Sequence, residues 1–158
     1  ESIEFKYNPK CNLIQNINRK LPDESQTQLN FTFDSRCNVI EAIENSGKTK
    51  TAHVSAEYTP QGKTKFLRDL KNNLEIALTY WEFGKPESIT LRNVGTLLVK
   101  YQKNGEIEGV DTFPHGAGKE RFKDQDPTKY QAVILREVRS ALDNILQYLR
   151  PAGLSMGF

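Results

Sequence analysis

The residues best able to do chemistry in this chain are basic and aromatic side chains that recur beside turn clusters. The set comprises Lys6, Tyr7, Lys10, Arg36, Lys100, Tyr101 and Lys103. Each lies in or next to a stretch where apolar and polar residues alternate before a turn, a pattern typical of a β-hairpin. Exposed rings can stack on unpaired bases while nearby cations meet phosphates, so this set predicts an interface for a single-stranded, anionic partner. Alternatively, the aromatic side chains are core residues and the lysines only protect exposed turns and edge strands from aggregation.

No arrangement of residues specifies a reaction. His53 and His115 are the only histidines, and no acid, nucleophile or third metal ligand stands near either at a useful spacing. The stretch 116–119, Gly-Ala-Gly-Lys, is followed by Glu120, whereas a phosphate-binding loop needs Ser or Thr after its lysine. We therefore expect a protein that is not an enzyme, with no catalytic residues, no metal and no cofactor.

The two cysteines, Cys11 and Cys37, occupy equivalent positions in two predicted hairpins. In consecutive hairpins of one meander these positions lie at the same end of the sheet, two strands and thus about 9–10 Å apart. A disulfide spans at most roughly 7 Å between α-carbons, so we expect two free thiols. A disulfide here would require the hairpins to fold toward each other, and would indicate an oxidising compartment.

Composition sets few limits on function. The 158 residues carry a net charge of only +2, so no overall field indicates nucleic acid or membrane as the partner. No apolar run is long enough to span a membrane, and we expect no membrane partner. The length and composition are typical of a single soluble domain, and they leave the compartment unassigned.

Alternating segments predict several hairpins. Residues 5–17 match residues 31–43 at an offset of 26, and each copy predicts two strands joined by a tight turn. Residues 97–110 predict a third hairpin, because Asn104-Gly105 at its tip accepts positive φ at little cost. The alternation in residues 51–59 predicts a further strand.

Two segments show helical spacing of apolar residues. Residues 63–82 carry one such stripe, and a second helix should begin at Asp126-Pro127, a combination typical of an N-cap and first turn. The first stripe ends at Trp81, the expected core anchor, and comprises Leu67, Leu70, Leu74, Leu78 and Trp81. The second comprises Ile134, Val138, Leu142, Ile145 and Leu149.

Residues 67–81 match residues 135–149 at an offset of 68, which indicates a duplication. The predicted fold is therefore α+β, with antiparallel β-hairpins followed by a long amphipathic helix, duplicated about a pseudo-two-fold axis. We expect one domain over residues 1–158. Its repeat halves would span about 28–84 and 88–150, with an extra N-terminal hairpin over 3–18.

This order of elements resembles the PUR-repeat and Whirly families of single-stranded nucleic-acid-binding proteins. The similarity to PUR repeats lies in residues 31–43 and 66–70, and the similarity to Whirly proteins lies in residues 128–149. The resemblance implies a curved sheet that carries single-stranded DNA or RNA, backed by helices. The leading hypothesis is thus a non-catalytic nucleic-acid-binding module that uses a basic and aromatic sheet face. The alternative is a structural or assembly subunit that docks other protein subunits through its sheet or its helix pair.

Overall fold

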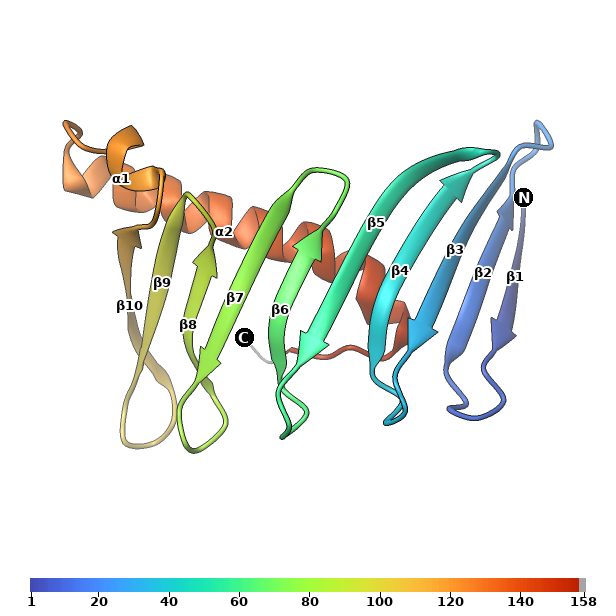
Figure 1. Cartoon of the computed structure of the whole chain (residues 1–158), viewed down its shortest axis with the longest axis horizontal. Helices are drawn as coiled ribbons and strands as arrows, with labels where there is room; N and C mark the ends of the chain where they lie inside the picture. Colours follow the sequence, from blue (N-terminus) through green and yellow to red (C-terminus); the bar gives the residue numbers. More distant parts are fainter. Residues whose placement is uncertain (157–158) are drawn as a thin grey trace. The chain divides into compact units, whose positions relative to one another are not determined.

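The computed structural model describes residues 1–156, and within them ten strands hydrogen-bond in sequence order as one antiparallel meander, followed by one long helix (Figure 1). The strands are β1 (Ser2–Tyr7), β2 (Ile14–Lys20), β3 (Gln26–Phe33), β4 (Val39–Ser46), β5 (Thr49–Tyr58), β6 (Thr64–Asp69), β7 (Leu74–Tyr80), β8 (Pro86–Leu91), β9 (Gly95–Tyr101) and β10 (Ile107–Pro114). A short helix α1 (Gly118–Arg121) precedes the long helix α2 (Pro127–Leu149), and the 3-10 helix η1 (Arg150–Ala152) follows it. No helix among residues 1–156 is both long and apolar enough to cross a membrane.

The predicted duplicated α+β fold is wrong, because residues 63–82 form β6 and β7 rather than a helix. A turn separates the two strands: Asp69 accepts hydrogen bonds from the backbone N–H and side chain of Asn72, and Asn73 takes a positive φ of 55°. Within β7, Ile76 and Leu78 are both buried at the strand period of two. The helical spacing of the leucines was therefore incidental.

The offset of 68 residues does not mark a structural repeat. Residues 67–81 form strands and a turn, whereas residues 135–149 lie in α2. The offset of 26 residues does correspond to equivalent structures, since β1 pairs with β2 and β3 pairs with β4, each across a short turn. The prediction for α2 is also confirmed: all five residues of its predicted stripe are buried, and Asp126 Oδ1 accepts a 2.9 Å hydrogen bond from the Thr128 N–H.

The expectation of free thiols is wrong as well. Cys11 and Cys37 form a disulfide, with their α-carbons 5.4 Å apart. The expected separation holds only for cysteines that lie on the strand axes. Cys11 and Cys37 lie instead in turns beyond the strand ends, where the ladder of hydrogen bonds no longer holds neighbouring chains at the sheet spacing. The two hairpin tips can therefore approach each other.

The chain divides into two compact units. Unit 1 contains residues 1–57, 68–73 and 145–156, and unit 2 contains residues 58–67 and 74–144. The core of unit 1 includes Phe31, Val39, Ala42, Val54, Ile145 and Leu149, and that of unit 2 includes Ile76, Ile89, Leu97, Val99, Ile134 and Val138. In unit 2 a side chain at Gly95 would collide with Ile134, so this glycine lets α2 approach the sheet closely.

Candidate nucleic-acid interface

Three hairpin turns lie at one end of the strands of unit 2, opposite α1 (Figure 1). They span residues 59–63, 81–85 and 102–106, and all have one backbone geometry. The first residue donates its N–H to the carbonyl of the fifth at 2.7–2.9 Å, and the fourth donates to the carbonyl of the first at 2.8–2.9 Å. The fourth residue is Gly62, Gly84 or Gly105, with φ between 84° and 88°, a conformation that glycine adopts without strain.

An aromatic cluster covers the second and third turns. Trp81 and Phe83 stack with ring centroids 6.3 Å apart and planes 8° from parallel, and Phe83 meets Tyr101 edge-on at 5.9 Å. Trp81 is 39% exposed and Phe83 is 63% exposed. Large aromatic rings usually bury most of their surface in a core, whereas this cluster leaves much of its ring surface accessible.

Hydrogen bonds fix the orientation of two of these rings. Trp81 Nε1 donates to the carbonyl of Val99 at 3.4 Å, and the Tyr101 hydroxyl donates to the carbonyl of Pro86 at 2.8 Å. A tyrosine phenol is protonated at neutral pH and so can donate this hydrogen bond, and burial raises the pKa of Tyr101 further above its ordinary value. Trp81 and Tyr101 are thus held in place by contacts within the chain.

Lysines accompany the rings along the same turns. Lys85 Nζ lies 5.3 Å from the centre of the Tyr101 ring, close enough for a cation–π interaction, and donates a hydrogen bond to the carbonyl of Gly105. A Cβ atom at Gly84 would lie 3.6 Å from Lys63 Cε, so Lys63 runs past the neighbouring turn. Lys103 belongs to the third turn. The turns also carry two carboxylates, Glu82 and Glu106.

The structure brings two of the three predicted site residues of unit 2 into this region, Tyr101 and Lys103. Lys100 is held elsewhere: its Nζ pairs with Asp111 Oδ2 at 2.6 Å. The hydrogen bond and charge of Asp111 raise the pKa of Lys100. Successive residues of a strand point to opposite faces, so Lys100 and Tyr101 do not share one surface.

In unit 1 the predicted residues divide into two groups. Lys10 and Arg36 adjoin the two cysteines of the disulfide, so the bridge holds these two turns together. Tyr7 is 59% exposed, but it alternates with Lys6 along β1, which places the two side chains on opposite faces. Of the predicted residues of unit 1, only Lys10 and Arg36 therefore lie in turns that the disulfide joins.

Sequence reasoning missed Trp81, Phe83, Lys63 and Lys85. Trp81 was expected to be a core anchor, which is wrong, because the helix that would have buried it does not exist. A signal was present: an aromatic residue stands four positions before a glycine or cysteine at 7–11, 33–37, 58–62, 80–84 and 101–105. Each of these segments forms the turn of a hairpin, and recognising this motif would have placed Trp81 in a turn.

The two histidines have structural contacts. His53 Nε2 lies 2.8 Å from Glu41 Oε2, and His115 Nδ1 accepts a 3.3 Å hydrogen bond from the N–H of Asn93. Within residues 1–156, no group of three or more His, Cys, Asp or Glu side chains could hold a metal ion. The aromatic and basic turns of unit 2 are therefore the strongest candidate site on this part of the chain.

Neither a protein-family model nor a curated protein matches this chain. The function is accordingly inferred from the geometry of the site alone.

Proposed function

We propose that this chain is a non-catalytic module that binds single-stranded nucleic acid, and that the turns of unit 2 form its binding surface. The observation that supports this most is the exposed cluster of Trp81, Phe83 and Tyr101, in which Trp81 and Tyr101 are hydrogen-bonded and Lys85 lies over the Tyr101 ring. Preformed rings beside cations suit a single strand, because every base has a face that can stack and every linkage carries a charge.

The balance of charges indicates that stacking supplies most of the affinity. Each base stacked on an aromatic ring contributes roughly 1–3 kcal/mol. Lys63, Lys85 and Lys103 can contact three phosphates at most, and Glu82 and Glu106 on the same turns oppose this attraction. With three contacts the logarithm of the binding constant should fall with the logarithm of salt concentration with a slope no steeper than about −2.

The disulfide indicates in which kind of compartment the protein works. Structural disulfides persist in oxidising compartments and are rare where thiols are kept reduced. The bridge between Cys11 and Cys37 therefore favours an encounter with nucleic acid outside a reducing compartment.

Intrinsic fluorescence provides a direct test, because Trp81 is the only tryptophan of the chain. We expect single-stranded DNA and RNA oligonucleotides to quench Trp81 fluorescence at micromolar concentrations, and we expect weaker binding in higher salt. Phe83→Ala keeps the reporter and removes one ring, so it should weaken binding by roughly 5- to 150-fold, which corresponds to 1–3 kcal/mol.

Phe113→Ala is the matched control. Phe113 is also an exposed phenylalanine of unit 2, 50% accessible, but it lies on β10 outside the cluster. This variant should bind as the wild type does. Absence of quenching in low salt, or equal losses from Phe83→Ala and Phe113→Ala, would refute the proposed site.

The second candidate function, a subunit that docks other proteins through its sheet, is favoured by a different observation. The two end strands of the meander, β1 and β10, each carry large apolar side chains that are well exposed, among them Phe5 and Ile107, both 47% exposed. Open sheet edges of this kind are sites where another strand can add.

A further inference from the structure

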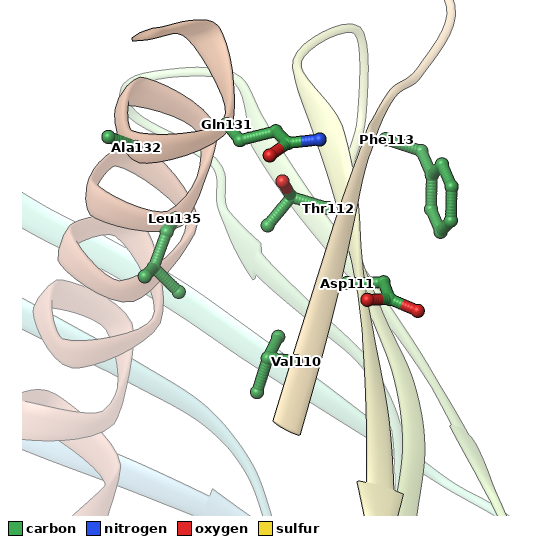
Figure 2. Close-up of a pocket in the computed structure, with 7 residues that line it drawn as sticks. All are labelled: Val110, Asp111, Thr112, Phe113, Gln131, Ala132 and Leu135. Atoms are coloured by element: carbon green, nitrogen blue, oxygen red, sulfur yellow. The ribbon is translucent and has the colours of Figure 1, made fainter. Parts of the chain in front are cut away.

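The last strand of the sheet borders a groove. β10 is an end strand in the sheet order, so its outer backbone groups are not used by a neighbouring strand. Between β10 and α2 lies a groove of roughly 330 Å³. Figure 2 shows Val110 and Thr112 on the side of β10 that faces α2, with Gln131 and Leu135 of α2 across from them and Asp111 and Phe113 pointing away.

At the groove, part of the core side of unit 2 is left uncovered. Val110 is opposite the fully buried Val99 in the register of β9 and β10, yet it is itself 39% exposed. A further strand beside β10 would cover Val110 and would place its own alternate side chains against Leu135. The groove therefore suits an extended strand with apolar residues at every second position.

The first strand of the same chain has this pattern. On β1, Ile3, Phe5 and Tyr7 alternate with Glu4 and Lys6, and these three apolar or aromatic side chains are 47%, 47% and 59% exposed. Phe5 lies opposite Ile17, which lies opposite Leu29, and Leu29 is on the same face of β3 as the buried Phe31. The exposed side chains of β1 thus lie on the core side of their sheet, as Val110 does on β10.

We propose that the chain self-associates head to tail, with β1 of one copy adding to β10 of another and placing Phe5 and Tyr7 in the groove beside α2. An antiparallel addition continues the alternation of strand directions in the meander. The contact joins two different surfaces, so a dimer keeps one free β1 edge and one free β10 edge. This inference is independent of the nucleic-acid proposal, because neither edge contains the aromatic turns.

Charge selects one register for this contact. Placing Lys6 opposite Asp111 puts Phe5 opposite Thr112 and Tyr7 opposite Val110, on the groove side. Asp111 already pairs with Lys100, so Lys6 would give this carboxylate a second cation. A shift by two residues would instead place Glu4 opposite Asp111, where like charges repel.

The expected contact is weak, because one pair of short strands buries less than the roughly 1,000 Å² of a stable interface. Sedimentation velocity from about 10 µM to about 1 mM should therefore show a weight-average mass that rises with concentration. Phe5→Lys and Val110→Lys should each abolish this rise, since each places a charge in the contact. Leu70→Lys is the control, because Leu70 is as exposed as Phe5 but lies in the turn between β6 and β7.

A mixture of the two variants provides the decisive measurement. Phe5→Lys retains an intact β10 edge and Val110→Lys retains an intact β1 edge, so the mixture should form heterodimers that cannot grow further. This recovery also shows that both variants are folded. The proposal is overturned if the wild type stays monomeric at every concentration, if Leu70→Lys blocks association equally, or if the mixture remains monomeric. It also fails if only one single variant loses association, since that result indicates contact between two identical edges.

Discussion

Removal of the disulfide between Cys11 and Cys37 tests how the hairpins of unit 1 are arranged. The bridge joins two turns that are separated by 26 residues and brings their α-carbons to 5.4 Å. The turns also have internal hydrogen bonds: Asn8 Oδ1 accepts from the N–H groups of Lys10 and Cys11. We therefore expect the turns to form without the bridge, so that its loss changes stability rather than fold.

The magnitude follows from the size of the closed loop. In the chain-entropy model, a bridge across a separation of 26 residues lowers the entropy of the unfolded chain enough to stabilise the native state by about 3.5 kcal/mol. With a urea dependence of about 2 kcal/mol per molar, the unfolding midpoint should fall by roughly 1.5–2 M.

Urea unfolding followed by far-UV circular dichroism measures this change. Wild-type protein in reducing agent and the variant Cys11→Ala/Cys37→Ala should unfold at similar, lower midpoints, and the variant should not respond to reducing agent. Cys37 has a positive φ of 64°. Replacing it with glycine in Cys11→Ala/Cys37→Gly should therefore recover about 1 kcal/mol relative to the double-alanine variant.

Two outcomes would refute this account of the hairpins. Titration of two free thiols in the unfolded, non-reduced protein would show that the bridge does not form. An unchanged midpoint in reducing agent, with complete reduction verified by mass spectrometry, would show that the bridge does not restrict the unfolded chain.

Two further predictions concern close packing and a turn carboxylate. A Cβ atom at Gly118 would lie inside van der Waals contact with the backbone carbonyl of Val94. Gly118→Ala should therefore lower the free energy of unfolding by about 2 kcal/mol and the melting temperature by roughly 4–8 °C. Gly109→Ala is its control, because nothing lies within 4 Å of a Cβ there, and an unchanged melting temperature for Gly118→Ala would contradict the packing. Burial raises the pKa of Asp34, but hydrogen bonds from Asn38 and Arg36 and the charge of Arg36 outweigh it, so its pKa lies below the ordinary value of 3.8. Because the folded pKa is the lower one, the stability from this carboxylate is present above about pH 4 and is lost as the pH falls through the folded pKa. An NMR titration should give a midpoint below 3.8 for Asp34, and Asp34→Asn should remove this part of the acid dependence; a midpoint at or above the ordinary value would contradict the turn geometry.

Local sequence determined those helices and hairpins whose residue pattern fits only one type of secondary structure. The stripe of α2 is long, matches no strand period, and begins at a capping aspartate followed by proline, so the helix was predictable. The hairpin over residues 97–110 was predictable because Asn104-Gly105 provides a turn, and Gly105 takes a φ of 88°. In such segments the backbone preferences of a few neighbouring residues suffice.

Residues 63–82 were ambiguous because their leucines fit a helix while Leu74, Ile76 and Leu78 fit a strand. Pairing with β8 makes this part of the segment a strand, because Leu78 is opposite Ile89 and both side chains are buried. The residues of the candidate site were likewise predicted only where the local pattern fits one structure. Tyr101 and Lys103 were identified from their hairpin, but Trp81 and Phe83 were missed because their turn was hidden in the predicted helix.

The sequence by itself thus determined three of the hairpins, the C-terminal helix and the positions of several exposed cations. Only the tertiary structure decided which turns lie together, and hence that Cys11 reaches Cys37 and that Phe83 lies between Trp81 and Tyr101. The physical reason is that turn and periodicity signals act over a few residues. Contacts between hairpins depend on how whole strands pair and where the chain bends beyond them, and no short stretch of sequence encodes that.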